Sequence, residues 1–572
     1  MHKLKQLLHK IDGQSYGAYK SIKGRYEFER FDLDIIKVQG DPFASPSLLE
    51  VSFLSTDFGF EPQCWSNADR RLGLENGIHH LASDALGRSK RRGSGKSGAI
   101  QIQSVGQSMF KRSSVEVEGN KVFIKFYVGL PAAGRRVLGR EAMEMLLTDI
   151  PDWVERMDLN DNGQALKMEQ FALTNEKAEA IRKQLKANNW LAFIQNGSVL
   201  ARKSGVDDRP MEDAVKFQSP ASMEVEISVL GESMKGMAIP HGITVITGGG
   251  FHGKSTLLNA LEYGVYNHIP SDGRTYCITD ENAVKVRAED GRYMQGVNIS
   301  PFINNLPHKK DTVNFSTENA SGSTSQAGNI MEAISLGANA LLIDEDTSAS
   351  NFMVRDQKVQ SLIKADKEPI TAFIERVQDL KAAGISSVMV IGGLGDYFEV
   401  ADQVLMLDEY KVKEVTAEAK AIIEKFGGHQ RTVEHQADFQ PFQMKLDWPR
   451  IKSHFGDRDK TKSRDLDEIS VNKDSINIRS LEQLVEPAQA NLIAALLAKM
   501  GKGNFGSGDL AAVATEMQEQ LSQQNFEDLT GPSGNLSFVR KYEFAAAVSR
   551  WKVSEQQPQR ERGGGRRYGR RH

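Results

Sequence analysis

The sequence predicts an α/β fold, in which a core with a mixed, mainly parallel sheet is flanked by an α+β N-terminal domain and a mainly helical C-terminal region. Two continuous apolar runs, NALLID and SSVMVIGG, are typical of strands buried on both faces of a parallel sheet. The segment between them, ITAFIERVQDLKAAG, has the spacing of a crossover helix that ends in glycine. Strand-like and helix-like segments therefore alternate from about residue 222 to 410.

Changes of pattern divide the 572 residues into four parts. Residues 1–205 hold an amphipathic opening segment, strand-like runs (DLDIIKVQG, LLEVSFL, NKVFIKFYVGL) and helical spacing, which predict an α+β domain. Residues 206–410 form the alternating core. Residues 411–555 are expected to be mainly helical, with SLEQLVEPAQANLIAALLAKM the clearest helix and the polar stretch 456–475 a loop. Residues 556–572, rich in arginine and glycine, are expected to be disordered.

The composition indicates a soluble protein of a reducing cytoplasm. The two cysteines, Cys64 and Cys277, cannot form a disulfide framework. No apolar run approaches the roughly 20 residues that span a bilayer, and the N-terminus lacks the apolar segment of a signal peptide. The net charge of −3 favours no partner class, so any surface for nucleic acid must be local. We therefore expect no membrane partner.

The segment TGGGFHGKST follows an apolar strand and opens a helix, which is the context of a phosphate-binding P-loop. Its glycines let backbone N–H groups converge on phosphate oxygens, and the helix N-terminus favours an anion. We expect Lys254 to reach the β- and γ-phosphates as a catalytic group and Ser255 to bind Mg²⁺. The predicted ATP-binding residues here are Gly248, Gly249, Gly250, Phe251, His252, Gly253, Lys254, Ser255 and Thr256. A glycine-rich turn that matches by chance is the alternative, and SGKSG at 94–98 is only a basic loop.

Two carboxylates stand where the run LLID ends. Asp344 is the natural residue to hold Mg²⁺, and Glu345 is placed to polarise the attacking water as the catalytic base. The alternative is an ordinary exposed acidic strand end. A P-loop about 90 residues upstream favours the catalytic interpretation.

The succession SGSTSQAGNIMEAISLGANALLIDEDTSASN resembles the signature motif, Walker B strand and D-loop of the ATP-binding cassette (ABC) ATPases. RAEDGRYMQGVNISPFINNLP and GGLGDYFEVADQVLML make the sequence similar to a soluble family described as predicted ATPases of the ABC class, over most of residues 15–410. The resemblance implies a head-to-tail homodimer in which Ser321, Gly322, Ser323 and Gln326 contact the nucleotide of the opposite subunit. A relative in a kinetoplastid mitochondrial RNA-editing machinery forms a ring-like homodimer that binds RNA, which implies nucleic acid, with RNA favoured over DNA.

The sequence departs from the ABC pattern near the γ-phosphate. Gly392 or Gly393 stands where transporter cassettes have a switch histidine, and Asp396 is the nearest polar candidate. In the D-loop, Asp346 replaces the usual proline and adds a carboxylate near the magnesium. Asn351 replaces the usual aspartate and removes a charge from the expected dimer seam.

The glutamine loop of ABC cassettes is also altered. Asn298 or Ser300 occupies the expected place, and Gln295 is a possible substitute. Only about 20 residues separate this stretch from the signature, too few for the helical subdomain that contacts membrane partners, which disfavours a transporter subunit. Hydrolysis is therefore expected to be slow, with ATP binding acting chiefly as a dimer clamp.

Basic residues gather in two places. One set would form a stripe that follows phosphates if its members share a face; the alternative is a solvated surface. GRR at 134–136 could instead reach the nucleotide. Arginine, glycine and one tyrosine in the tail suit single-stranded nucleic acid, and a solubilising end is the alternative. The first set is Arg88, Lys90, Arg91, Arg92, Lys96, Lys111, Arg112, Arg135, Arg136 and Arg140; the tail set is Arg560, Arg562, Arg566, Arg567, Tyr568, Arg570 and Arg571.

The expected function is that of an ABC-class ATPase that hydrolyses ATP-Mg in a homodimer and clamps or remodels nucleic acid. The alternative is a nucleotide-dependent switch that acts on a protein partner. The histidines are scattered along the chain, and no metal besides Mg²⁺ is expected.

Overall fold

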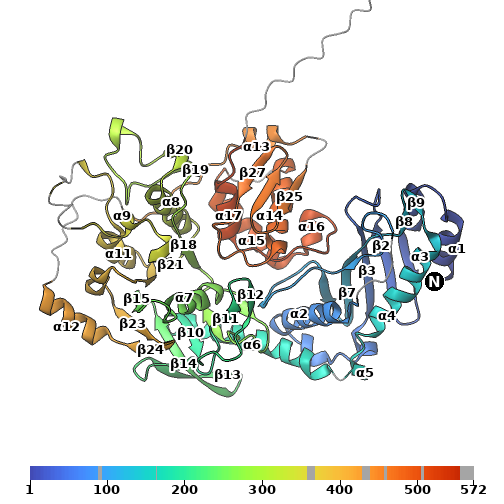
Figure 1. The fold of residues 1–572 in the computed structure, drawn as a ribbon, viewed down its shortest axis with the longest axis horizontal. Helices are drawn as coiled ribbons and strands as arrows, with labels where there is room; N and C mark the ends of the chain where they lie inside the picture. The colour runs from blue at the N-terminus through green and yellow to red at the C-terminus, as the bar shows by residue number, and fades with distance from the viewer. Residues whose placement is uncertain are drawn as a thin grey trace, which may run out of the picture.

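The computed structural model describes residues 1–87, 93–162, 164–356, 362, 367–427, 438–456, 460–503 and 508–553. Figure 1 shows the N-terminal part at one end of the molecule, the α/β core at the other, and the C-terminal part packed beside the core. No helix within these residues combines the length and the apolar character that a membrane crossing requires.

The N-terminal part is built on an antiparallel sheet in the order β1-β2-β3-β7-β4, with β6 also paired to β7. The predicted runs DLDIIKVQG, LLEVSFL and NKVFIKFYVGL form β2, β3 and β7, because their alternating apolar residues face one core. The strands are β1 Gly24–Glu27, β2 Asp32–Lys37, β3 Ser47–Leu54, β4 Ile100–Gln101, β6 Val115–Glu118 and β7 Lys121–Val128; the helices are α1 His2–Ile11, α2 Ala68–Ala85, α3 Gly139–Glu144, α4 Ile150–Glu155 and α5 Leu159–Asn162.

A buried histidine lies in this core. His79 on α2 is fully buried, with Nε2 2.7 Å from the Gln103 carbonyl oxygen and Nδ1 2.8 Å from Ser114 Oγ. Burial, and then the nearby charge of Arg112, lower the pKa of His79 to about 3. The folded state therefore favours the neutral imidazole.

Acidification is expected to destabilise the N-terminal part through His79. The stabilisation is fully present above the unfolded-state pKa of about 6.5 and is lost as pH falls toward the folded-state pKa. At pH 5 the free energy of unfolding should be lower by about 2 kcal/mol. Hydrogen exchange along α2 at pH 7 and pH 5 measures this loss. His79→Gln should reduce the pH dependence, and His9→Gln, at an exposed site, should keep it. Equal pH dependence in the two variants would contradict the assignment.

A second antiparallel sheet, in the order β13-β14-β10-β17, joins the N-terminal part to the core. Strand β10 pairs with β14 and β17, so this sheet spans the expected boundary at residue 205. Helix α6 packs on α2, and the approach is close: a Cβ on Gly73 would lie 2.3 Å from the Phe171 carbonyl oxygen. The elements are α6 Ala165–Ala187, β10 Trp190–Gln195, β11 Arg202–Ser204, β12 Asp207–Pro210, β13 Glu224–Val229, β14 Glu232–Pro240 and β17 Cys277–Thr279.

The core sheet has the order β18-β21-β22-β15-β23-β24, and its neighbours are parallel except for β23 and β24. The predicted mixed, mainly parallel sheet is confirmed. All residues of β21 and β22 are buried, as their continuous apolar runs predicted. The strands are β15 Ile243–Gly248, β18 Ala283–Val286, β21 Ala340–Asp344, β22 Ser386–Val390, β23 Gln403–Asp408 and β24 Lys411–Glu414; the helices are α7 Lys254–Tyr263, α8 Gly322–Ser335, α9 Ser350–Met353, α11 Phe373–Ala382 and α12 Thr416–Phe426.

The C-terminal part is mainly helical, as expected, and it also holds a three-stranded antiparallel sheet. The prediction of a loop over 456–475 is wrong. Ile469, Val471 and Ile476 alternate with polar residues and are buried in the core to which α14 also contributes, whereas the surrounding lysines and aspartates hide this alternation in the sequence. The elements are α13 Trp448–His454, β25 Thr461–Arg464, β26 Glu468–Val471, β27 Asp474–Asn477, α14 Pro487–Lys502, α15 Leu510–Gln523, α16 Phe526–Thr530 and α17 Lys541–Ser549.

Candidate active site

The loop between β15 and α7 has a backbone that only glycine adopts readily at its two ends. Gly248 has φ 139° and Gly253 has φ 96°. A Cβ would lie 2.3 Å from the Leu407 carbonyl oxygen at Gly248 and 2.6 Å from the Tyr410 ring at Gly253. Glycine is therefore required at these two positions by the close approach of β23 and the turn that follows it.

Lys254 points back across this loop. Its Nζ donates to the carbonyl oxygens of Gly248 at 2.8 Å and Gly249 at 2.9 Å. The ammonium group is thus held over the concave side of the loop, where the phosphates of a nucleotide would lie. Ser255 is exposed and Thr256 half-buried at the first turn of α7, so the residue types and their placement fit a nucleotide phosphate chain with Mg²⁺.

The turn between β23 and β24 braces the same loop. The Glu409 N–H donates to His252 Nδ1 at 3.1 Å, and the Tyr410 N–H donates to the His252 carbonyl oxygen at 3.0 Å. His252 thus contributes to the shape of the loop, while the Phe251 side chain at its tip is 98% exposed.

The acidic end of β21 lies at the same edge of the sheet as the loop. Asp344 and Ile246 both pair with Val390, one from each side of β22, so β21 and β15 end level with each other. Two strand spacings separate them, about 10 Å. Asp344 is 6% exposed, and its Oδ1 accepts a hydrogen bond from the Asp346 N–H at 3.2 Å. Parallel strands thus bring together the predicted magnesium residue and the phosphate loop.

Glu345 is fixed by the two glycines that stand in the switch-histidine position. Its Oε2 accepts hydrogen bonds from the N–H groups of Gly392 at 2.7 Å and Gly393 at 3.1 Å. Sequence reasoning found the glycines but missed this role, although their position directly after a buried neighbouring strand was the available signal. Asp396 lies further along, in the short turn Gly395–Glu399.

The signature segment caps α8. Ser321 is the exposed N-cap residue, and its Oγ accepts from the Thr324 N–H at 3.4 Å. The Gly322 N–H donates to Asp290 Oδ1 at 2.7 Å, and Gly322 and Ser323 are buried. Ser321 therefore lies at the surface, whereas the backbone behind it is held by Asp290.

Gln326, a predicted contact to the nucleotide of the opposite subunit, makes side-chain contacts within its own chain. Its side chain is fully buried. Nε2 donates to Ser348 Oγ at 3.0 Å, and Oε1 accepts from the Ala349 N–H at 2.9 Å. Because Gln326 lies one helical turn inside α8, its amide faces the D-loop segment (residues 346–351) of the same chain and joins it to the signature helix.

The glutamine-loop candidates lie in or beside a hairpin formed by β19 (Arg292–Val297) and β20 (Phe315–Ala320). Gln295 accepts from the Tyr293 hydroxyl at 2.8 Å, and Asn298 Oδ1 accepts from the Ser300 hydroxyl at 2.7 Å. Figure 1 shows this hairpin at the upper end of the core and α7 at the lower end. The three candidates are thus held by local contacts.

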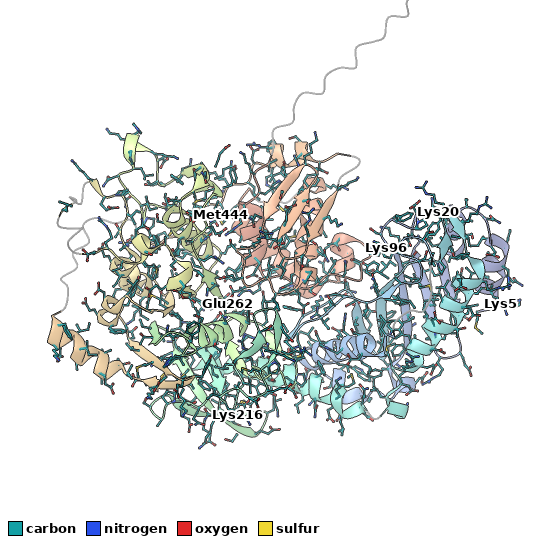
Figure 2. The ribbon with its side chains drawn as sticks, viewed as in Figure 1. Lys5, Lys20, Lys96, Lys216, Glu262 and Met444 are labelled. Carbon is teal, nitrogen blue, oxygen red and sulfur yellow. The ribbon has the colours of Figure 1, made fainter. Side chains whose placement is uncertain are left out.

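The predicted basic stripe is corrected at two positions. Lys111 donates to the carbonyl oxygens of Leu521 and Gln524, and Arg112 is buried against Glu486, so both join the N-terminal to the C-terminal part. Figure 2 shows Lys96 on the side of the N-terminal part that faces the C-terminal part. Lys96, Arg135, Arg136 and Arg140 are exposed, whereas Arg88, Lys90, Arg91, Arg92 and the arginines and tyrosine of the tail lie outside the described residues.

Three family models match consecutive stretches of the chain. One described as ATPase of the ABC class N-terminal matches residues 1–160, the P-loop domain of ABC ATPases matches 164–444, and the MRB1590 C-terminal domain matches 460–556. The middle match contains the phosphate loop, the acidic end of β21 and the signature segment, and it confirms the predicted fold class.

An uncharacterised protein of Methanocaldococcus jannaschii, MJ1628, is 27% identical over 309 residues, which cover 52% of this chain and 66% of the relative, just under two thirds of its length. Two solved ABC-transporter cassettes are each 12% identical. MJ1267 in its ADP conformation covers 35% of this chain and 92% of its own at a TM-score of 0.23. A nucleotide-free cassette covers 39% and 89% at a TM-score of 0.21.

Proposed function

The chain belongs to the family of ABC-class ATPases, and from this premise we propose that it binds and hydrolyses ATP-Mg in a head-to-tail homodimer that clamps or remodels nucleic acid, RNA rather than DNA. The observation that carries the proposal is the convergence of Lys254, Asp344 and Glu345 at one edge of the sheet. A P-loop lysine beside an acidic strand end is the arrangement that enzymes use for phosphoryl transfer.

Each group has a separate part in the proposed reaction. The loop N–H groups and Lys254 bind the phosphates, and Ser255 with Asp344 would hold Mg²⁺, which would neutralise charge on the phosphate oxygens. Glu345 orients the attacking water and accepts its proton. The N–H groups of Gly392 and Gly393 orient that carboxylate by hydrogen bonds. One of these glycines stands where transporter cassettes have the switch histidine.

The dimer is proposed from the placement of the signature. Ser321 is exposed at the N-terminus of the 14-residue helix α8, where the helix dipole favours an anion. Ser350 and Asn351 of the D-loop segment are exposed as well. Because Gln326 joins the two segments, a partner subunit that touches one would also displace the other.

RNA binding is proposed from the family resemblance and from the arginine- and glycine-rich tail. Deletion of residues 556–572 is expected to weaken the affinity for a single-stranded RNA by about tenfold or more at low salt and to flatten its salt dependence, because fewer phosphates are neutralised. Fluorescence anisotropy at 50 mM and 200 mM salt measures both.

The matched control is the double variant Lys3→Gln/Lys5→Gln, which removes exposed charge outside the predicted basic stripe and leaves the tail intact, so RNA affinity should stay unchanged. If the full chain binds neither RNA nor DNA but still binds ATP, the protein-directed switch replaces the nucleic-acid proposal. Equal affinity and salt slope with and without the tail would contradict its role.

A further inference from the structure

Residues 287–290, in the five-residue connection between β18 and β19, contact both parts of the proposed dimer seam. The Ala288 N–H donates to the Thr347 carbonyl oxygen in the D-loop segment at 2.9 Å. Asp290 accepts from the Gly322 N–H at 2.7 Å, and the Glu289 N–H donates to Ser325 Oγ in the signature helix at 2.8 Å. A shift of this segment would therefore move the signature and the D-loop together.

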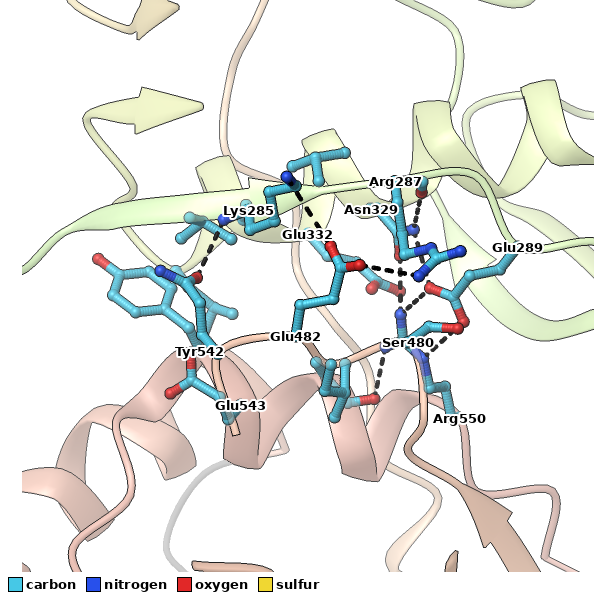
Figure 3. A pocket seen from close by; sticks show the side chains of 17 residues that line it. Lys285, Arg287, Glu289, Asn329, Glu332, Ser480, Glu482, Tyr542, Glu543 and Arg550 are labelled. Atoms are coloured by element: carbon cyan, nitrogen blue, oxygen red, sulfur yellow. Dashed lines mark hydrogen bonds and ion pairs between the residues drawn. The ribbon is translucent and has the colours of Figure 1, made fainter. Parts of the chain in front are cut away.

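The opposite side of the segment is held by the C-terminal part. Figure 3 shows Arg550, at the end of α17, reaching the Glu289 carboxylate and Asn329 of α8. Arg550 Nε lies 3.1 Å from Glu289 Oε2, its Nη2 contacts Glu289 Oε1, and the same Nη2 lies 3.0 Å from Asn329 Oδ1. Asn329 in turn donates to Glu289 Oε1 at 3.0 Å and to the Arg287 carbonyl oxygen at 2.8 Å. The contact thus has the two-pronged geometry of a strong arginine–carboxylate pair.

The pair is buried, which makes it sensitive to the loss of either partner. The side chains of Arg550 and Glu289 are 7% and 11% exposed. Burial alone would raise the pKa of Glu289, but the charge and hydrogen bonds of Arg550 outweigh it and lower the pKa to about 2. Glu289 therefore stays ionised at neutral pH, and removing Arg550 would leave an unpaired charge that is relieved only by moving the segment toward water.

A second arginine strengthens the same contact. Arg292, the first residue of β19, pairs with Glu332 of α8, and the Ser549 hydroxyl of α17 accepts from Arg292 Nη2 at 3.0 Å. The last residue of α17, Ser549, and Arg550 directly after it therefore contact the start of β19 and the link that precedes it. Around them lies a cavity between the core and the C-terminal part, lined among others by Arg287, Glu332 and Glu482.

We propose that Arg550 and Glu289 are a positioning pair through which the C-terminal part sets the placement of the signature and D-loop segments, so that displacement of α17 changes ATP turnover. The proposal rests on the proposed ATPase function. Neither residue is a catalytic residue: Arg550 acts through Glu289, and Glu289 acts through the backbone of its segment.

Arg550→Met is expected to lower kcat by about tenfold while the KM for ATP and the affinity for ADP change less than about twofold, because the phosphate loop binds nucleotide without the segment. In a Glu345→Gln background, the same change should lower the fraction of the chain that dimerises at saturating ATP. Arg550→Lys, which keeps the charge and loses the fork, should restore part of kcat. If Arg550→Met does not fold, Glu289→Gln removes the charge pair while keeping the size of the side chain and an oxygen that accepts from Arg550.

The matched control is Arg112→Met. Arg112 and Glu486 form an equally buried pair, with side chains 2% and 4% exposed, which joins the C-terminal to the N-terminal part through Asn76, Ser108 and Ser537. Its loss should lower the melting temperature as Arg550→Met does and leave kcat within about twofold. Equal losses of kcat in the two variants would show that Arg550 has only a structural role and would overturn the proposal.

Hydrogen exchange separates this proposal from the ATPase proposal. Arg550→Met should speed amide exchange at residues 287–290 and 321–326, and Arg112→Met should not. If the unsubstituted chain hydrolyses no ATP, the proposed function fails while the exchange result still decides whether the pair holds the segment. Unchanged exchange at Ala288 and Gly322 would overturn the positioning pair even in an active enzyme.

Discussion

Glu345→Gln is expected to lower ATP turnover by about 10²-fold or more while ATP still binds, so that an ATP-dependent dimer accumulates. The amide keeps the size of the side chain and can still accept from the N–H groups of Gly392 and Gly393, but it cannot take a proton from water. The phosphate loop and Asp344 are unchanged, which preserves binding. Phosphate release measures turnover, and light scattering with and without ATP-Mg measures the dimer.

Asp346→Asn is the matched control for this variant. Asp346 is the exposed neighbouring carboxylate. Its backbone N–H, not its side chain, donates the hydrogen bond to Asp344. Its turnover should stay within a few-fold of the unsubstituted chain. Normal turnover in Glu345→Gln would show that Glu345 is not the base, and greater loss in Asp346→Asn would move the assignment to that neighbour.

Lys254→Ala is expected to weaken ATP affinity by about 10²-fold, which corresponds to about 2.7 kcal/mol of binding free energy. The ammonium group now rests on the carbonyl oxygens of Gly248 and Gly249, and it would exchange these bonds for phosphate oxygens. Fluorescent-nucleotide titration or calorimetry with ATP-Mg measures the loss. Turnover should fall with it because the same charge stabilises the transferring phosphoryl group.

Lys411→Ala controls for the loss of a positive charge at the same side of the sheet. Lys411 is exposed on β24, beside the turn that braces the phosphate loop. Lys411→Ala should bind ATP with unchanged affinity. Without nucleotide, Lys254→Ala and Lys411→Ala should both have the melting temperature of the unsubstituted chain, since neither side chain is buried. Unimpaired ATP binding by Lys254→Ala would refute the phosphate-loop assignment.

The predictable part of the fold follows from local pattern. Apolar runs such as LLID and SSVMV predicted buried strands, and the glycines of TGGGFHGKST predicted a loop of unusual backbone, which Gly248 and Gly253 adopt. The sheet over 461–477 was missed because only Ile469, Val471 and Ile476 carry its alternation, in strands of four residues each. Strands this short are stable only through the surrounding core.

The site shows the same division. Charge and spacing alone predicted Lys254, Asp344 and Glu345, because phosphate and magnesium chemistry require particular side chains. Lys111 and Arg112 were expected to be exposed, in a stripe or on a solvated surface, because a sequence gives the charge of a side chain but not its partner. The partners, Glu486 and the carbonyl oxygens at the end of α15, lie about 400 residues away. The bonds of Gln326 to Ser348 and Ala349 were not predicted, since a motif does not tell which face of its helix is buried.

By itself, the sequence determined the phosphate loop, the acidic strand end and the alternation that makes a parallel sheet, since these depend on side-chain chemistry and short-range periodicity. The tertiary structure alone decided that the backbone of Gly392 and Gly393 holds Glu345 and that Arg550 holds Glu289 beside the signature. Nearly every residue has a backbone N–H, and Arg550 and Glu289 are 261 residues apart. Neither interaction therefore produces a local sequence pattern. Both arise only when the strands and helices pack.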